Sequence, residues 1–203
     1  MLKKILICFS MLFAILCYCG ATVEADELTD QVGIYFSGKA GLAVENASYL
    51  QTKGGDASTG FGTNTAFMGG LEIGYDWSKK YEPNFRTGVE YSVRCMTDFK
   101  HNHKTVQTGA IQTVFANVYY DFKEISPVTY PYVGGGIGAS FMPNGDGDVN
   151  FAWNIGSGVR HTITDNWTIG LGYRYCDYGK FEHDHTTAHL AGHEVLAELA
   201  YTF

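Results

Sequence analysis

The feature of this sequence that most restricts its fold is a period of two that recurs in eight segments. In each segment apolar residues occupy every second position, and turn residues separate one segment from the next. The segments cover approximately residues 33–45, 65–77, 85–98, 106–122, 130–141, 149–163, 166–178 and 190–203. Each has about 11 to 17 residues, and a tilted strand crosses a bilayer in about 9–11. The pattern therefore predicts eight strands long enough to span a membrane.

The two alternating positions differ sharply in chemistry. One is apolar, as at Leu42, Ile73 and Val118, and the other carries glycines such as Gly74 and Gly136 together with charges. The charged residues at these positions are Lys39, Glu72, Arg86, Glu90, Arg94, Arg160, Arg174, Glu194 and Glu198. A soluble barrel would leave mid-strand glycines facing water, where they cost stability. In a narrow eight-stranded barrel they instead make room in the lumen for large charged side chains. We therefore expect an all-β fold, an eight-stranded antiparallel up-and-down transmembrane β-barrel with its apolar face toward lipid.

Composition agrees with this fold and excludes one class of partner. Aromatic residues make up 15% of the chain and there are 25 glycines, which suits strands rather than helices. The net charge is −7, and no basic stripe is present, so we expect no nucleic-acid partner. No cofactor is expected.

The first residues have the pattern of a signal peptide. Lys3 and Lys4 supply positive charge, and residues 5–18 form an apolar run too short for a typical membrane-spanning helix. Ala25 is the preferred cleavage point, with Ala21 second. The sequence thus predicts export.

The positions of the cysteines agree with a division of the chain into a signal peptide and a barrel domain. A signal peptide over residues 1–25 would remove three of them and leave a barrel domain over 26–203, although a lipoprotein site at Cys17 or Cys19 is a weaker alternative. The remaining Cys95 and Cys176 have opposite phases in their strands, so no disulfide is expected between them.

The connections between the segments alternate in length. The turns over 78–84, 123–129 and 164–166 are short and would be periplasmic. The connections over 46–64, 99–105, 142–148 and 179–189 are mostly longer and would be surface loops. The loop over 46–64 is the segment expected to contact partners, because loops on a rigid scaffold usually carry recognition.

The fourth and fifth segments resemble a known family. Asn117-Val118-Tyr119-Tyr120-Asp121-Phe122 and Pro131-Tyr132-Val133-Gly134-Gly135-Gly136-Ile137-Gly138 are similar to the small outer-membrane β-barrel family of OmpA-type and opacity-type surface proteins. The resemblance covers the mature chain and is clearest from Val114 onward. It departs from the family at Glu198-Leu199-Ala200-Tyr201, where members often have Gly-Leu-Arg-Tyr.

The resemblance implies the cell outer membrane as the location and outer-membrane lipid as a partner. It also implies a signal for the barrel assembly machinery, carried by Tyr201 and Phe203. Family members serve as structural proteins, adhesins and immune-evasion antigens. No peptidoglycan-binding domain is expected after the last strand.

The lumen charges should pair, because an unpaired buried charge is costly. Folding the last two strands together places Arg174 roughly opposite Glu194, and closing the barrel places Lys39 near Glu198. This arrangement favours a salt-bridged plug, with a narrow gated pore as the alternative.

Other clusters are weaker candidates for chemistry. His183, His185 and His189 could bind a metal ion, but their spacing matches no established site and metal-free surface histidines are the preferred interpretation. Residues 144–148 resemble a calcium loop without its downstream glutamate and read as a turn.

An enzymatic function is not expected. Lipid A deacylases of this size use a histidine and a serine two residues apart, and the chain contains no such pair. A soluble lipocalin-like binder is disfavoured by the glycine and charge positions. We therefore expect a surface protein that is structural or binds a host or matrix ligand through its loops.

Overall fold

The computed structural model describes residues 33–53, 56–79, 84–96, 99–101, 104–106, 110–141, 149–183 and 186–203. The expected signal peptide, His185 and residues 144–148 lie outside these ranges. Among the described residues, no helix is long and apolar enough to span a membrane.

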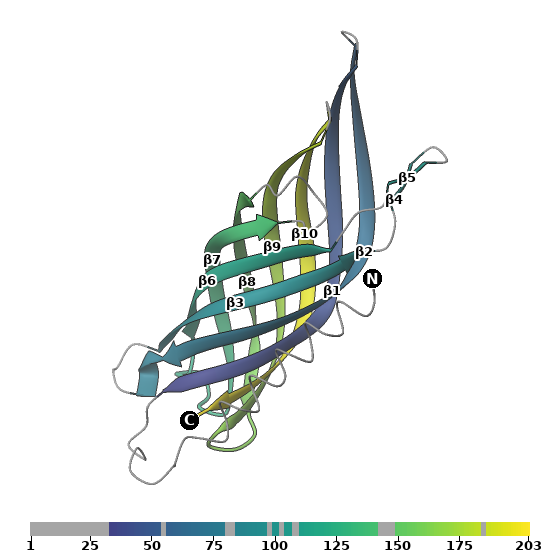
Figure 1. The fold of residues 1–203 in the computed structure, drawn as a ribbon. Helices are drawn as coiled ribbons and strands as arrows, with labels where there is room; N and C mark the ends of the chain where they lie inside the picture. Colours follow the sequence, from purple (N-terminus) through teal and green to yellow (C-terminus); the bar gives the residue numbers. More distant parts are fainter. Residues whose placement is uncertain are drawn as a thin grey trace, which may run out of the picture. The chain divides into compact units, whose positions relative to one another are not determined.

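Eight long strands form one closed antiparallel barrel in the order β1-β10-β9-β8-β7-β6-β3-β2, as the alternation predicts (Figure 1). Their bounds are β1 Ile34–Lys53, β2 Asp56–Asp76, β3 Phe85–Met96, β6 Ile111–Asp121, β7 Thr129–Phe141, β8 Val149–Thr162, β9 Trp167–His183 and β10 Thr186–Thr202. The short strands β4 (Phe99–His101) and β5 (Lys104–Val106) form a separate two-stranded sheet. A 3-10 turn, η1 (Trp77–Lys79), follows β2.

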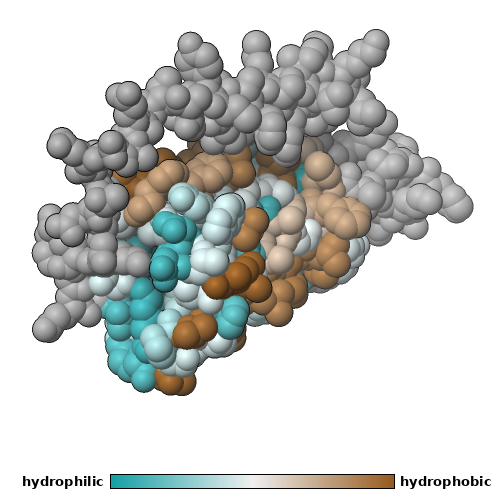
Figure 2. All heavy atoms as spheres, turned by 90° about the horizontal axis from the view of Figure 1, so that it is seen from below, coloured by the Kyte–Doolittle hydropathy of each residue, from teal (hydrophilic) through white to brown (hydrophobic). Residues whose placement is uncertain are grey.

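The outer face of the barrel is apolar and its inner face is polar, which is the reverse of a soluble protein. Phe67 is 73% exposed, and Ile137 and Leu171 are each 62% exposed, whereas Arg94 and Glu90 are fully buried. Figure 2 views the protein from the end that lies at the bottom of Figure 1 and shows hydrophobic residues on the outer wall. Lipid is the environment that makes such an outer face stable.

Glycine is required in the lumen where two strands or a large side chain come close. A β-carbon at Gly74 would collide with the ring of Tyr35 and the carbonyl oxygen of Thr87. One at Gly138 would collide with the backbone of Val114. These glycines let the large lumen side chains and the neighbouring strands approach each other.

The prediction of a long loop over residues 46–64 is wrong. β1 runs on to Lys53 and β2 begins at Asp56, and the pairing between them is continuous as far as Lys53↔Asp56. The polar composition of this stretch hides its strands, because above a membrane both faces of a hairpin can meet water.

Two further loop predictions need correction for the same reason. In the stretch 179–189, β9 continues to His183 and β10 begins at Thr186. In the stretch 99–105 the chain forms β4 and most of β5, and the following barrel strand starts at Ile111 rather than at residue 106.

The opposite end of the barrel is closed by short turns. At the end of β2, the Asp76 carboxylate accepts hydrogen bonds from the backbone N–H and the hydroxyl of Ser78. Lys123 Nζ donates to Ser78 Oγ and lies 3.3 Å from Asp76 Oδ2. In the next turn, the backbone N–H of Glu124 and the Asn84 amide hold the pKa of the Glu124 carboxyl below its ordinary value. Short turns at this end identify it as the periplasmic side.

Candidate functional site

The nine charged residues named from the sequence, here called the lumen network, all lie inside the barrel. Each is at most 7% exposed. They come from six of the eight barrel strands, β1, β2, β3, β8, β9 and β10, because the period of two directs alternate side chains of every strand inward.

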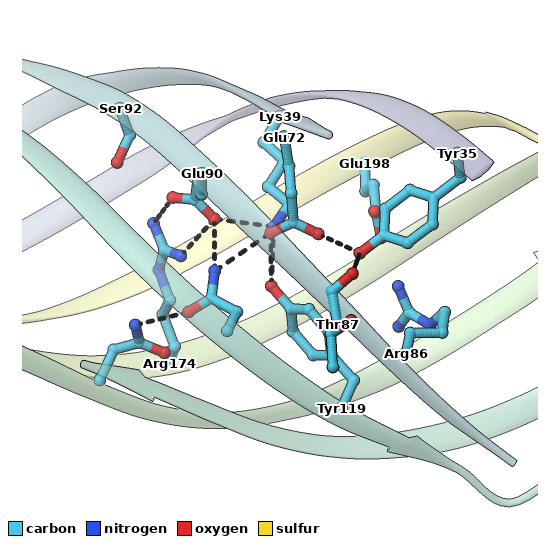
Figure 3. Close-up of polar contacts among 12 residues, drawn as sticks. Tyr35, Lys39, Glu72, Arg86, Thr87, Glu90, Ser92, Tyr119, Arg174 and Glu198 are labelled. Carbon is cyan, nitrogen blue, oxygen red and sulfur yellow. Dashed lines mark hydrogen bonds and ion pairs between the residues drawn. The ribbon is translucent and has the colours of Figure 1, made fainter. Parts of the chain in front are cut away.

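At the middle of the lumen, one ammonium group joins two carboxylates (Figure 3). Lys39 Nζ lies 2.8 Å from Glu72 Oε2 and 2.7 Å from Glu90 Oε2. It also donates to the hydroxyl of Tyr119 at 3.0 Å, and that hydroxyl donates to Glu72 at 2.7 Å. The Asn117 amide donates to Glu72 at 3.1 Å. Both carboxylates are therefore paired and hydrogen-bonded.

Toward the outer end, two arginines share one carboxylate. Arg174 donates through both terminal nitrogens to Glu90, at 2.9 and 2.8 Å, and through Nε to Glu194 at 2.5 Å. Arg94 Nε donates to the other oxygen of Glu194 at 2.5 Å, and its guanidinium lies 4.7 Å from the ring centre of Tyr178. These contacts link β3 across the lumen to β9 and β10.

Toward the periplasmic end, Arg86 binds Asp121 through Nε at 2.7 Å and Nη2 at 3.2 Å. The guanidinium lies 4.5 Å from the ring centre of Tyr119. Arg160 Nε lies 3.5 Å from Glu198 Oε2. A third layer of ion pairs thus lies below the central one.

Of the two ion pairs expected from the sequence, one forms and the other does not. Arg174 and Glu194 are Cα partners and form an ion pair. Lys39 and Glu198 are also Cα partners, but the Lys39 ammonium reaches Glu72 and Glu90 instead. Glu198 contacts Arg160. Strand register alone therefore does not determine the partner of a long side chain that can cross the lumen.

Several lumen residues were not named from the sequence. Asp121, Tyr119 and Asn117 lie on the inward phase of β6, and Tyr35 and Glu45 lie on that of β1. Their alternation with the apolar positions was a signal that could have identified them. Both carboxylate oxygens of Glu45 are buried and have no hydrogen-bond partner among the described residues.

Of the three candidate metal ligands, only His189 has a side chain among those that the structure describes. His189 Nε2 lies 3.1 Å from Asp177 Oδ1. His183 is the last residue of β9, and His185 lies outside the described residues. No group of three or more His, Cys, Asp or Glu side chains suited to a metal occurs among the described residues. Cys95 is exposed and Cys176 is buried, and both are free thiols.

The residues proposed as an assembly signal lie on the lipid face. Phe203 is 65% exposed, and its backbone N–H donates to the Ile34 carbonyl at 2.9 Å. The rings of Trp167 and Tyr201 are 5.0 Å apart, and those of Tyr201 and Phe203 are 4.9 Å apart. They form an aromatic row that runs from the start of β9 to the chain end after β10, beside the junction with β1.

A second candidate surface rises beyond the outer rim. β3 pairs with β2 only as far as Ala66, whereas β1 and β2 continue together to Lys53 and Asp56. β1 also pairs with β10 up to Gln51↔Thr186. We call this extension the raised sheet; it consists of residues 177–183, 186–191, 46–53 and 56–63 of β9, β10, β1 and β2 (Figure 1). Beyond the level of Ala66, β1 continues for roughly ten residues, about 33 Å along the strand.

Comparisons with known proteins agree on the architecture. A family model described as outer membrane protein beta-barrel domain matches residues 12–203. Outer membrane protein PagN of Salmonella typhimurium is 28% identical over 193 residues, covering 79% of this chain and 78% of PagN. Neisserial surface protein A covers 84% of this chain and 97% of its own, with 21% identity and a TM-score of 0.59. OprG from Pseudomonas aeruginosa has 12% identity and a TM-score of 0.54, covering 85% of this chain and 97% of its own. At these identities the two solved structures show the fold.

Proposed function

The chain belongs to the outer membrane protein β-barrel family and is an integral protein of that membrane, and from this premise we propose that it binds a host or environmental partner through its raised sheet. The observation that carries this proposal is the contrast between the two ends of the barrel. The periplasmic end has short turns, whereas four strands extend far past the outer rim. A strand extension of this length adds nothing to membrane spanning, so its role lies outside the membrane.

The barrel itself serves as a rigid, closed scaffold for this surface. The ion pairs of the lumen network cross from β3 to β9 and from β3 to β10, and so occupy the space through which ions would pass. A non-enzymatic role is supported by the histidines whose side chains are described. His161 contacts Thr129, His189 contacts Asp177, and His193 contacts Tyr173. These hydrogen-bond partners are a threonine, an aspartate and a tyrosine, rather than the serine or cysteine nucleophile that acyl transfer commonly uses.

Shortening the hairpin tests the proposed function. Glu45 and Asn64 are Cα partners, so residues 46–63 can be replaced by an Asn-Gly turn without changing the strands below. Bacteria that display the shortened protein should adhere to cultured epithelial cells at least tenfold less than bacteria with the parent. Heat-modifiable gel migration should show that the shortened barrel still inserts.

Deletion of the β4–β5 hairpin, residues 99–106, is the matched control and should leave adherence near the parental level. Unchanged adherence by a correctly inserted shortened barrel would contradict the proposal.

A further inference from the structure

The raised sheet has an open edge on β2. The pairing of β2 with β3 stops at Ala66↔Met96, and no strand in the described part of the chain pairs with residues 57–63 on the side away from β1. β4 lies near β2 but pairs with β5 in its own small sheet, and the upper ends of the β1 and β2 ribbons rise well past both (Figure 1). We call residues 57–63 of β2, on this side, the free edge.

The register identifies which backbone groups face outward there. Asp76 N–H donates to the Gly33 carbonyl at 2.7 Å, so Asp76 directs its backbone groups toward β1. Pairing between β1 and β2 continues without a bulge to Lys53↔Asp56. Because successive residues of a strand point their N–H and C=O groups to opposite sides, the even-numbered residues of β2 bond to β1. Ala57, Thr59, Phe61 and Thr63 therefore direct theirs away from it.

The free edge lacks the features by which proteins usually block an exposed strand. Residues 56–65 read Asp-Ala-Ser-Thr-Gly-Phe-Gly-Thr-Asn-Thr, with no proline, lysine or arginine. No bulge twists the edge away. An unblocked edge of this kind is a template for another strand.

We propose that the free edge binds an extended segment of a partner protein as an added antiparallel or parallel strand. Recognition would come from the outward N–H and C=O groups of residues 57, 59, 61 and 63 rather than from side-chain charge. This mode of binding uses main-chain hydrogen bonds for affinity. The inference rests on the proposed function and adds to it the site and the chemical class of the partner.

The geometry of the membrane disfavours a second copy of this chain as the occupant. All copies in one membrane share one orientation, so two identical edges can meet only about an axis along the membrane normal. Such an axis sets each outward N–H opposite the same N–H of the other copy. The two edges then cannot form a regular ladder of hydrogen bonds.

Proline substitution tests the backbone mode directly. The double variant Thr59→Pro with Phe61→Pro removes two outward N–H groups but leaves the groups that bond to β1, so the hairpin should persist. The control, Thr59→Val with Phe61→Leu, changes the same side chains and keeps both N–H groups. The probe is a synthetic peptide with the sequence of residues 46–53, which is the natural antiparallel partner of residues 56–63 on their other side.

Fluorescence anisotropy should show the labelled peptide binding to the parent and the control in lipid vesicles, and at least tenfold more weakly to the proline variant. Epithelial adherence of the same three proteins should follow the same order. Equal peptide binding by the proline variant, or no binding to the parent at millimolar peptide, would overturn the inference.

The outcomes separate the two proposals. Loss of adherence on hairpin shortening, with adherence kept in the proline variant, would retain the proposed function and remove strand addition. Adherence unaffected by shortening would remove the proposed function. A dimer of the parent in detergent that the proline variant fails to form would assign the edge to a second copy and overturn the inference.

Discussion

Some charged side chains in the lumen form ion pairs with more than one partner. Glu90 illustrates this, because it accepts hydrogen bonds from both Lys39 and Arg174 and is fully buried. A neutral side chain at position 90 would remove one carboxylate partner from Lys39 and one from Arg174, in a lumen that holds little water. The stability of the barrel should therefore depend on individual charges of this network.

Glu90→Gln should lower the free energy of unfolding by about 3 kcal/mol, because it removes one partner of a buried charge group. Urea titration of the barrel in lipid vesicles, followed by tryptophan fluorescence, measures this. Glu124→Gln, in the exposed periplasmic turn, should change stability by less than about 0.5 kcal/mol. Equal effects of the two variants would show that the network contributes little.

Single glycines permit the close approach of strands. Gly138→Ala should destabilise the barrel by about 2 kcal/mol, because the added methyl group meets the Val114 carbonyl oxygen and the Phe115 α-carbon. Gly69→Ala is the control, since a β-carbon at Gly69 has nothing within 4 Å. The same urea titration would contradict this packing if both variants matched the parent.

At the scale of the strand, the sequence allowed some features to be predicted and not others. The inward and outward phases followed from the alternation, because lipid and a narrow lumen impose opposite chemistry on the two faces. The ends of β1 and β2 did not follow, since above the membrane neither face must be apolar. The Lys39 contacts did not follow either, because a long flexible side chain reaches past its register partner.

The aromatic row lies on the lipid face beside the junction of β1 and β10. Phe203→Ala should leave export intact and slow barrel assembly several-fold, because it removes an exposed ring that we propose the assembly machinery contacts. Phe203→Tyr keeps an aromatic ring and should assemble like the parent. The measurement is the time course of heat-modifiable migration after induction, and equal time courses for Ala and parent would remove this role.

At the scale of the whole molecule, the three layers of ion pairs predict a barrel that does not conduct. Planar-bilayer recordings of the parent should show no stable single-channel steps, even at high salt. The triple variant Lys39→Ser, Glu90→Ser and Arg174→Ser breaks the central and outer layers and should conduct. Regular steps from the parent that scale with salt would establish a pore.

The large sequence separation of the lumen contacts also affects how fast the barrel folds. Arg94 and Glu194 are separated by 100 positions in the chain, and Arg174 and Glu90 by 84. Contacts so distant in sequence form only after most of the chain has been threaded into place, and such topologies fold slowly. Until β9 and β10 are in place, Arg94 lacks its partner Glu194 and Glu90 lacks its partner Arg174. The ion pairs that fill the lumen of the finished barrel therefore form late in folding, when β9 and β10 join the earlier strands.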